Sequence, residues 1–255
     1  MTVTCEIDEA GVAVVTMANP PVNAITVADT WAIRDIFADL AANDAVRAVI
    51  LTASGKGFNA GIDIKEMQAS GEGGFDFLLS SGDACHKAFD QIYSTPVPVI
   101  AAVNDFCMGL GVGLVGSCDI IVASRKARFG LPEVDNGALG CASHLAKLVP
   151  PMKLRQMTLT CEPVGAEELH SWGTVYQLAE DDEELMQIAH ELASRIADKR
   201  GRVVRAAKSG LNGIDTFDLS HNYRLEQGYT YELNLYGDGS SARDAFVTGE
   251  RSVTR

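Results

Sequence analysis

A glycine-rich stretch at residues 107–119, CMGLGVGLVGSCD, constrains this chain more than any other feature. Its glycines Gly111, Gly113 and Gly116 have the G-x-G-x-x-G spacing of a dinucleotide-binding loop. Such a loop opens a full-length helix, and the strand after that helix ends in an acidic residue. Here only about two helical turns fit before the next predicted strand, which ends in Ala-Ser-Arg-Lys. The sequence therefore argues against a dinucleotide site.

Two other interpretations of these glycines stay open from the residues alone. The glycines allow a short helix to pack closely on a sheet. Alternatively, the turn before the helix presents backbone amides that stabilise a developing oxyanion. A second glycine-rich turn, residues 55–62, also follows a predicted strand and offers a matching amide.

The hydrophobic periodicity predicts strands and helices that alternate first, followed by a mostly helical end. Alternating residues predict a hairpin of residues 2–7 and 12–17, and apolar runs predict strands at 46–52, 96–103 and 119–124. Helices are expected at 26–42 and 75–93. After residue 143 we expect one further strand, at 175–179, and helices at 143–149, 152–160, 166–172, 182–199, 203–212, 219–236 and 242–250. The predicted fold class is α/β with a helical C-terminal portion.

The charge balance excludes some classes of partner. The 255 residues include 34 Asp and Glu but only 21 Lys and Arg, a formal charge of −13. This excess repels phosphate backbones and anionic lipid surfaces, so we expect neither nucleic acid nor membrane as a partner. The six cysteines lack the C-x-x-C spacing of a zinc site, and no apolar run approaches the ~18 residues of a membrane span. Without a basic signal region at its start, the protein is expected in the cytoplasm.

Four stretches in order carry a resemblance to a known family. They are GFNAGIDIKEM (57–67), PVIAAVN (98–104), DIIVAS (119–124) and FGLPE (129–133). Together they resemble the crotonase (enoyl-CoA hydratase/isomerase) superfamily over nearly the whole chain. The resemblance implies a spiral of ββα units at 1–195 and a helical trimerisation region at 196–255. It also implies a homotrimer, or a hexamer of two trimers, that acts on acyl-CoA. Coenzyme A is then part of the substrate, and neither a separate cofactor nor a metal is expected.

The resemblance also implies an oxyanion hole for the thioester carbonyl. Position by position, its two backbone amides fall on Ile62 and Leu110, where the family usually has glycine at the second place. The residues expected to bind the substrate or its CoA group are Ala60, Gly61, Asp63, Ile64, Lys65, Gly113 and Arg251.

The catalytic carboxylates depart from the usual hydratase pattern. Typical hydratases of the family use two glutamates, of which the second matches Glu133 and the first falls on Gly113. With Glu133 alone, ordinary hydration is doubtful, whereas a single base suits an isomerase or the activation of water for hydrolysis. His144 is a second catalytic candidate, because the family places its segment beside the acyl pocket and a neutral imidazole suits proton relay. His86 is a weaker candidate.

Further stretches are similar to a narrower branch of the superfamily, which opens a ring of a bicyclic CoA thioester in steroid degradation. These are FNAGIDIKEMQ (58–68), GLPEV (130–134), GALG (137–140) with His144, and YRLEQGYTYELNL (223–235). The implied reaction is a hydrolytic retro-Claisen cleavage, and the small Gly113 would leave room for a bulky acyl group. The alternatives are an enoyl-CoA hydratase or isomerase for a simpler enoyl-CoA, and a CoA-binding scaffold without turnover.

Overall fold

The computed structural model of the chain describes residues 2–63, 66 and 75–248. Its main sheet has the strand order β1-β2-β3-β4-β6-β9. The hairpin β1–β2 is antiparallel, and every later neighbouring pair is parallel. The strands of this sheet are β1 Thr2–Ile7, β2 Val12–Ala18, β3 Ala48–Ala53, β4 Val99–Val103, β6 Ile120–Ser124 and β9 Val175–Ala179. A second sheet contains β5 Cys107–Met108, β7 Arg128–Gly130 and β8 Val164–Gly165.

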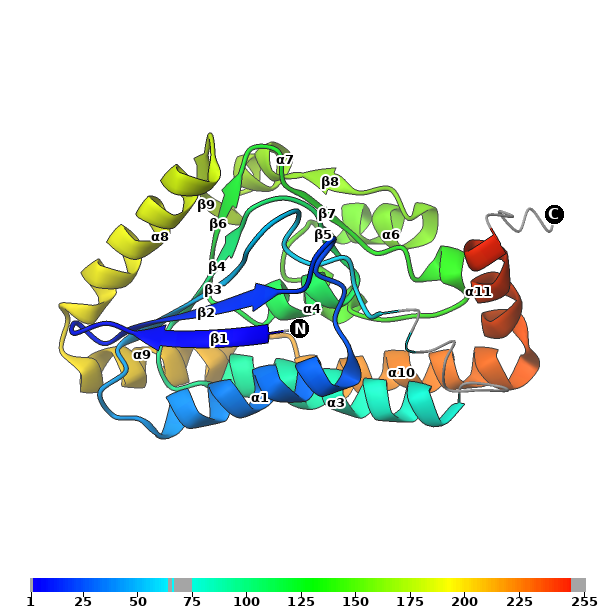
Figure 1. Cartoon of the computed structure of the whole chain (residues 1–255), viewed down its shortest axis with the longest axis horizontal. Helices are drawn as coiled ribbons and strands as arrows, with labels where there is room; N and C mark the ends of the chain where they lie inside the picture. Colours follow the sequence, from blue (N-terminus) through cyan, green and yellow to red (C-terminus); the bar gives the residue numbers. More distant parts are fainter. Residues whose placement is uncertain (1, 64–65, 67–74, 249–255) are drawn as a thin grey trace.

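Helices cover both faces of the main sheet. They are α1 Val27–Ala42, α3 Phe75–Ser94, α4 Leu110–Gly116, α5 Ala142–Leu145, α6 Pro151–Thr160, α7 Ala166–Ser171, α8 Asp182–Ala197, α9 Gly201–Ile214, α10 Leu219–Tyr236 and α11 Asp238–Thr248, with the 3-10 turn η1 Val134–Asn136. Alternation along β3 explains the two layers: Val49 and Leu51 pack with α1 and α3, whereas Ala48 and Ile50 pack with α8. Figure 1 shows α8 on one side of the sheet and α1, α3 and α10 on the other.

Most predicted elements are confirmed, with shifts at their ends. The hairpin, the strands near 46–52, 96–103 and 119–124, and the short helix within the glycine-rich stretch are all present. The expectation of a single strand after residue 143 was wrong, because β8 pairs antiparallel with β7. A two-residue strand has no periodicity by which to recognise it. The helix expected at 143–149 is only α5, one turn long. The division of the chain at residue 195 stays a prediction.

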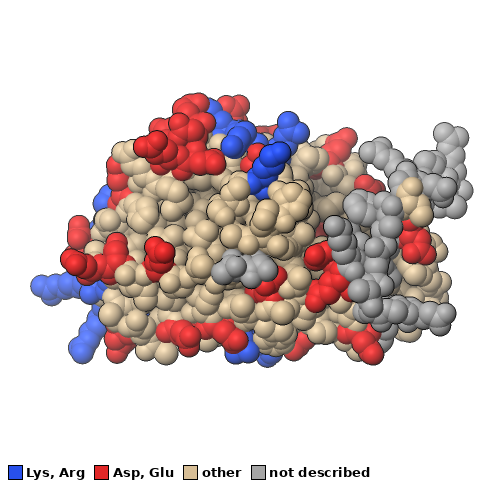
Figure 2. Space-filling view, in the orientation of Figure 1, with Lys and Arg blue, Asp and Glu red and all other residues tan. Residues whose placement is uncertain are grey.

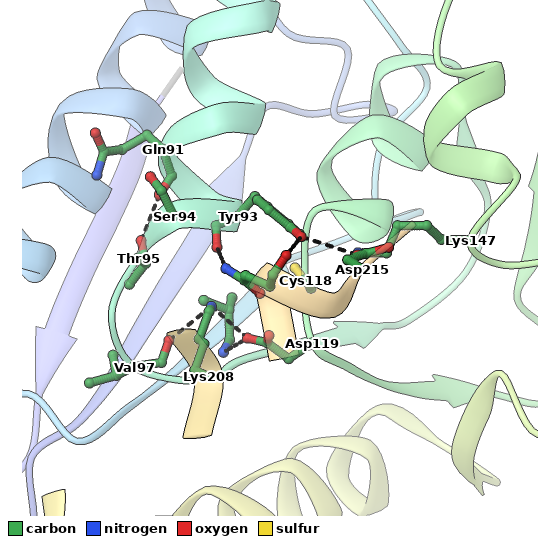
Figure 3. Close-up of polar contacts among 12 residues, drawn as sticks. Gln91, Tyr93, Ser94, Thr95, Val97, Cys118, Asp119, Lys147, Lys208 and Asp215 are labelled. Carbon is green, nitrogen blue, oxygen red and sulfur yellow. Dashed lines mark hydrogen bonds and ion pairs between the residues drawn. The ribbon is translucent and has the colours of Figure 1, made fainter. Parts of the chain in front are cut away.

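An ion pair between a buried lysine and a partly exposed aspartate joins α9 to the sheet at the edge where β4 and β6 begin (Figure 3). Lys208 is 3% exposed, and its Nζ donates to Asp119 Oδ2 at 2.7 Å and to the carbonyl of Val97 at 3.1 Å. The same Oδ2 accepts the amide of Val99 at 2.7 Å, so the pair also connects β4 with the start of β6. The two glycine-rich turns leave the sheet at the opposite edge, where β3 and β4 end.

Among the charged side chains on the face shown in Figure 2, acidic ones outnumber basic ones, in keeping with the composition. Figure 2 shows acidic side chains gathered where α8 begins, and its first turn carries Asp182, Glu183 and Glu184. Among the described helices, none combines the length and apolar character that a bilayer crossing requires. Within the same residues, His, Cys, Asp and Glu form no group of three that would suit a metal ion.

Candidate active site

The two glycine-rich bends lie side by side at the edge where β3 and β4 end. The amide of Phe58 donates to the carbonyl of Phe106 at 2.9 Å, and the amide of Met108 donates to the carbonyl of Asn59 at 2.9 Å. These bonds form a short parallel pairing between Asn59 and Cys107. Because parallel strands end at the same edge of a sheet, the loops that follow them meet there. The convergence of the two bends, which the oxyanion-hole interpretation requires, is therefore present.

The two amides expected to form the oxyanion hole both belong to this pair of bends. On either side of Ile62, the carbonyl of Gly61 and the amide of Asp63 bond to Ile25, each at 2.9 Å. Leu110 is the first residue of α4, where an amide has no partner within its own helix. In the described part of the chain, no hydrogen bond uses the amide of Ile62 or of Leu110. Both residues line the same cavity.

That cavity has a volume of about 980 Å³, its open mouth included. Its described wall comes from the two bends, the segment after β7, α3 and α10. The lining residues are Ala60, Gly61, Ile62, Leu78, Ser81, Gly82, Cys85, Gly109, Leu110, Pro132, Glu133, Asn136, Ala138, Leu139, Gly140, Cys141, Tyr223, Gln227, Thr230 and Tyr231. Most of this wall is apolar, as expected for a site that holds an organic acyl group.

Glu133 lies against the second bend, beside Gly109. Gly109 has φ 55° and ψ −115°, a conformation that residues with a Cβ rarely adopt. A Cβ on Gly109 would also lie 2.6 Å from Oε1 of Glu133 and 3.8 Å from Cα of Gly61. The absence of a side chain at Gly109 thus allows the carboxyl group to approach the point where the two bends meet.

Burial determines the acidity of Glu133. Its Oε2 is shielded from solvent and has no hydrogen-bond partner among the described residues. Burial raises the pKa of Glu133 to about 8, its own backbone amide opposes the rise, and the neighbouring carboxylate of Glu226 adds to it. A carboxyl group with a pKa this close to neutrality is suited both to accept and to return a proton.

The wall contributed by α10 was not predicted from the sequence. Tyr223, Gln227, Thr230 and Tyr231 line the cavity, and their i, i+4, i+7, i+8 spacing places them on one face of the helix. The sequence therefore does indicate that these four residues share one helix face. However, periodicity does not indicate which other element a helix face will meet. Cys85 of α3 also lines the cavity, and burial raises the pKa of its thiol to about 12.

The two candidate histidines lie behind this wall. His144 is 1% exposed, and its ring contacts those of Phe89 and Tyr223 at centroid distances of 4.7 and 5.6 Å. Burial lowers the pKa of His144 to about 3, so the imidazole is neutral. His86 contacts Ser220 Oγ through Nε2 at 2.9 Å and stacks on Tyr223. Neither histidine is among the described residues of the cavity wall. Their catalytic role stays a prediction, and it would have to act through Tyr223.

Gly113 requires a correction to its expected purpose. A Cβ on Gly113 would lie 2.2 Å from Cζ of Phe89, so the ring of Phe89 already occupies the adjacent space. Gly113 is not among the described lining residues of the cavity. The expectation that its small size leaves room for a bulky acyl group was therefore wrong. The glycine is required for packing between α4 and α3.

The remaining predicted binding residues are placed as follows. Ala60 and Gly61 line the cavity within the first bend. Asp63 follows them, and its amide is held by Ile25. Ile64, Lys65 and Arg251 lie outside the described residues.

Comparison with known proteins identifies the class to which this fold and site belong. A family model described as "Enoyl-CoA hydratase/isomerase" matches residues 7–247. The chain therefore belongs to the enoyl-CoA hydratase/isomerase, or crotonase, family. A solved enoyl-CoA hydratase/isomerase from Mycobacterium paratuberculosis superposes with a TM-score of 0.85 at 20% identity, covering 95% of this chain and 97% of that one. At this identity the likeness shows the shared fold.

Two curated relatives are much more similar in sequence. Both are named (7aS)-7a-methyl-1,5-dioxo-2,3,5,6,7,7a-hexahydro-1H-indene-carboxyl-CoA hydrolase, one from Rhodococcus jostii (strain RHA1) and one from Mycobacterium tuberculosis (strain ATCC 25618 / H37Rv). Each is 48% identical to this chain over 247 residues. The matches cover 97% of this chain and 95% and 99% of the two relatives.

Proposed function

We propose that this protein opens a ring of a bicyclic keto-acyl-CoA by hydrolysing a carbon–carbon bond, as one step in the degradation of a steroid. Support comes from the two hydrolases at 48% identity, whose names specify a bicycle with two ketone groups and a CoA-linked carboxyl group. Coenzyme A is then part of the substrate, and the reaction needs no separate cofactor or metal. The observation that carries the proposal is Glu133, whose unpaired Oε2 is buried where the two bends meet.

The proposed reaction is a retro-Claisen cleavage. The carboxylate of Glu133 takes a proton from water, and the oxygen of that water bonds to the carbon of a ring ketone. The carbon–carbon bond beside the former ketone then breaks. Its electron pair enters an enolate conjugated with the thioester, and the former ketone carbon becomes a new carboxyl group at the other end of the opened ring. Glu133 returns the proton to the enolate carbon, so the net change is the addition of one water.

In this scheme the two bends stabilise the enolate. The amides of Ile62 and Leu110 donate to the thioester oxygen as negative charge develops on it. One such donor is worth about 2.7–4 kcal/mol in comparable acyl chemistry. Because both groups are backbone amides, leucine at position 110 serves as well as the glycine usual in the family, provided that its N–H has the same direction.

The cavity gives little support to the hydratase alternative. Hydration across a double bond in this family uses two carboxylates around one water, and the position of the first is Gly113 in this chain. The ring of Phe89 fills the space beside that position. A single base in an apolar cavity fits hydrolysis better, because one group both accepts and returns the proton.

The proposal is tested with a panel of substrates. The protein is incubated with the bicyclic dioxo-hexahydroindene-carboxyl-CoA and, separately, with linear enoyl-CoAs. Ring opening and hydration both add one water, so NMR of the product must locate a new carboxylate. We expect ring opening of the bicycle and no change in the linear compounds. Hydration of the linear compounds alone would replace the proposal with a hydratase, and CoA binding without any turnover would indicate a scaffold.

The same assay tests the role of Glu133. Glu133→Gln should lower kcat by about 10²–10⁴-fold, the usual worth of a general base, while CoA binding survives. Glu232→Gln provides the matched control, because it removes the same charge from an exposed position on α10 and should keep the wild-type rate. Wild-type turnover by Glu133→Gln would contradict Glu133 as the base.

We also propose that the protein assembles as a homotrimer, alone or as two stacked trimers. Large apolar side chains are exposed on α6, α9 and α10, as expected for surfaces that associate. They are Met152, Leu159, Val203, Leu211, Ile214, Leu225, Tyr229, Leu235 and Tyr236. Light scattering after size-exclusion chromatography distinguishes a trimer of about 82 kDa from a hexamer or from the 27.2 kDa monomer. Location in the cytoplasm stays a prediction.

A further inference from the structure

Helix α10 binds the chain after Glu133 at two points, one before α5 and one in the first turn of α5. Thr230 Oγ1 accepts the amide of Leu139 at 2.8 Å and donates to the carbonyl of the same residue at 2.7 Å. One turn earlier, the carboxylate of Glu226 accepts the amides of Ala142 and Ser143, each at 2.8 Å. Two consecutive turns of α10 therefore hold both ends of the short segment 139–143.

Glu226 performs the task that a helix-capping residue normally performs. Cys141 is the N-cap of α5, but it is in the left-handed conformation at φ 60° and its side chain makes no capping bond. A residue with a Cβ adopts this conformation only when its surroundings enforce it. The first amides of α5 are satisfied instead by a carboxylate 84 and 83 residues further along the chain.

Glu133 contacts the residues that lead into the held segment through its main chain, and the held segment itself through its side chain. The carbonyl of Glu133 accepts the amides of Asn136 and Ala138, each at 2.9 Å. A Cβ on Gly140 would lie 3.8 Å from Cγ of Glu133, so the main chain at Gly140 packs beside the glutamate side chain. A shift of this segment would therefore move the carboxyl group relative to the two bends.

We propose that Glu226 and Thr230 are positioning residues: from α10 they fix the segment 139–143 and, through it, the carboxyl group of Glu133 in the cavity. This inference rests on the proposed function, in which Glu133 is the base. Thr230 acts on Glu133 by holding the main chain of Leu139 and brings no charge. Glu226 acts in the same way and also places a negative charge near Glu133.

The charge of Glu226 has a predictable sign. The titratable groups that face Glu133 are Glu226 of α10 and the thiol of Cys141 at the start of α5. Burial raises the pKa of Cys141 well above its ordinary value, so the thiol is neutral. Burial also raises the pKa of Glu226, but its bonds from Ser143 and Ala142 oppose that rise by favouring the ionised form. Removing this carboxylate should therefore lower the pKa of Glu133.

Three variants on α10 separate these effects in the ring-opening assay. In a plot of log kcat/KM against pH, the rising limb reports the pKa of the base. Glu226→Gln should shift this limb to lower pH and should also lower kcat about tenfold. Thr230→Val, which keeps the shape of the side chain but loses both bonds to Leu139, should lower kcat without shifting the limb. The matched control Glu232→Gln should change neither. A loss of fold alone does not produce a shift in the limb.

A second readout does not depend on turnover. In protein labelled with ¹³C at the glutamate carboxyls, the signal missing from Glu133→Gln identifies Glu133, and its titration gives the pKa directly. This pKa should fall in Glu226→Gln and stay unchanged in Thr230→Val and Glu232→Gln. If the wild type does not open the bicycle, the proposed function fails, while this titration still decides whether Glu226 controls Glu133.

Each contrary result overturns the inference. A Glu226→Gln enzyme with the wild-type limb and titration would show that its carboxylate does not act on Glu133. Wild-type kcat in Thr230→Val would show that the segment needs no restraint from α10. Should Glu226→Gln fail to fold, as judged by near-ultraviolet circular dichroism, the Thr230→Val result alone decides whether α10 positions the base.

Discussion

Two of the ionisable sites that the structure describes, Lys208 with Asp119 and Glu133, lie at opposite edges of one sheet and are satisfied in opposite ways. Where β4 and β6 begin, the ammonium group of Lys208 contacts Asp119 and the carbonyl of Val97. Where β3 and β4 end, Glu133 has a buried Oε2 without a described partner and a pKa raised to about 8 by burial. The first arrangement satisfies its charges within the fold, whereas the second leaves capacity for a substrate or water.

This difference shows how a buried ionisable group indicates its role. A paired ion contributes to stability mainly because either partner alone would be costly to bury. An unpaired carboxyl group in a cavity is unfavourable for the folded protein, and such groups are concentrated at functional sites. The two sites therefore predict opposite responses to substitution.

The largest effect is expected from breaking the ion pair. Asp119→Ala leaves the ammonium group of Lys208 buried without its carboxylate and should lower the free energy of unfolding by about 3–5 kcal/mol. The double variant Asp119→Ala/Lys208→Met should be more stable than the single variant, because no unpaired charge remains. Urea unfolding measures all three proteins. Equal stability of the single and double variants would contradict the pairing argument.

The opposite response is expected at Glu133. Its pKa is about 8 in the folded protein against 4.5 ordinarily, so between these values the folded state holds a proton that the unfolded state has released. Stability should therefore fall as pH rises through this window. Glu133→Gln removes the dependence and should be more stable than wild type at pH 8, by on the order of 3 kcal/mol. The gain should vanish near pH 4.5, and unfolding across this range would show it. A stability difference that does not change with pH would break the comparison.

The position of the unpaired carboxyl group is tested at Gly109. Gly109→Ala introduces a Cβ 2.6 Å from Oε1 of Glu133 at a backbone φ of 55°. We expect kcat to fall about 10²-fold, as for a catalytic group displaced by about 1 Å. Gly165→Ala is the control, since no atom lies within 4 Å of its added Cβ and its φ is −82°. A wild-type rate in Gly109→Ala would show that Glu133 does not depend on this contact.

The smallest effect is expected from enlarging Gly113, the position at which typical hydratases of the family have the first of their two glutamates. Gly113→Ala introduces a Cβ 2.2 Å from the ring of Phe89 and should lower the free energy of unfolding by about 1–3 kcal/mol. Gly113→Ala/Phe89→Leu should recover part of that loss. For the same reason, Gly113→Glu alone should not create hydratase activity. Thermal unfolding and the linear enoyl-CoA assay test these outcomes, and an unchanged stability of Gly113→Ala would mean that the ring moves away without cost.

Features encoded over a few residues were predictable. The alternation in β1 and β2, the apolar runs of β3 and β4, and the short space available for α4 all follow from local pattern. The order of the crotonase stretches pointed to Glu133 and to the two bends, and the structure brings these together at one cavity. Roles assigned to single residues from their size or type, as for Gly113 and His144, agreed less well with the structure. Gly113 packs against Phe89, and His144 lies behind Tyr223.

The sequence by itself determined the family, the order of the elements, the convergence of two glycine-rich bends and the single carboxyl group at residue 133. Only the tertiary structure decided that Lys208 is paired while Glu133 is not, and that α10 forms a wall of the cavity. The physical reason is the range of the interactions. Helical periods and turns arise from neighbouring residues, whereas the bond between Glu226 and Ala142 joins residues 84 positions apart and exists only once the chain has packed.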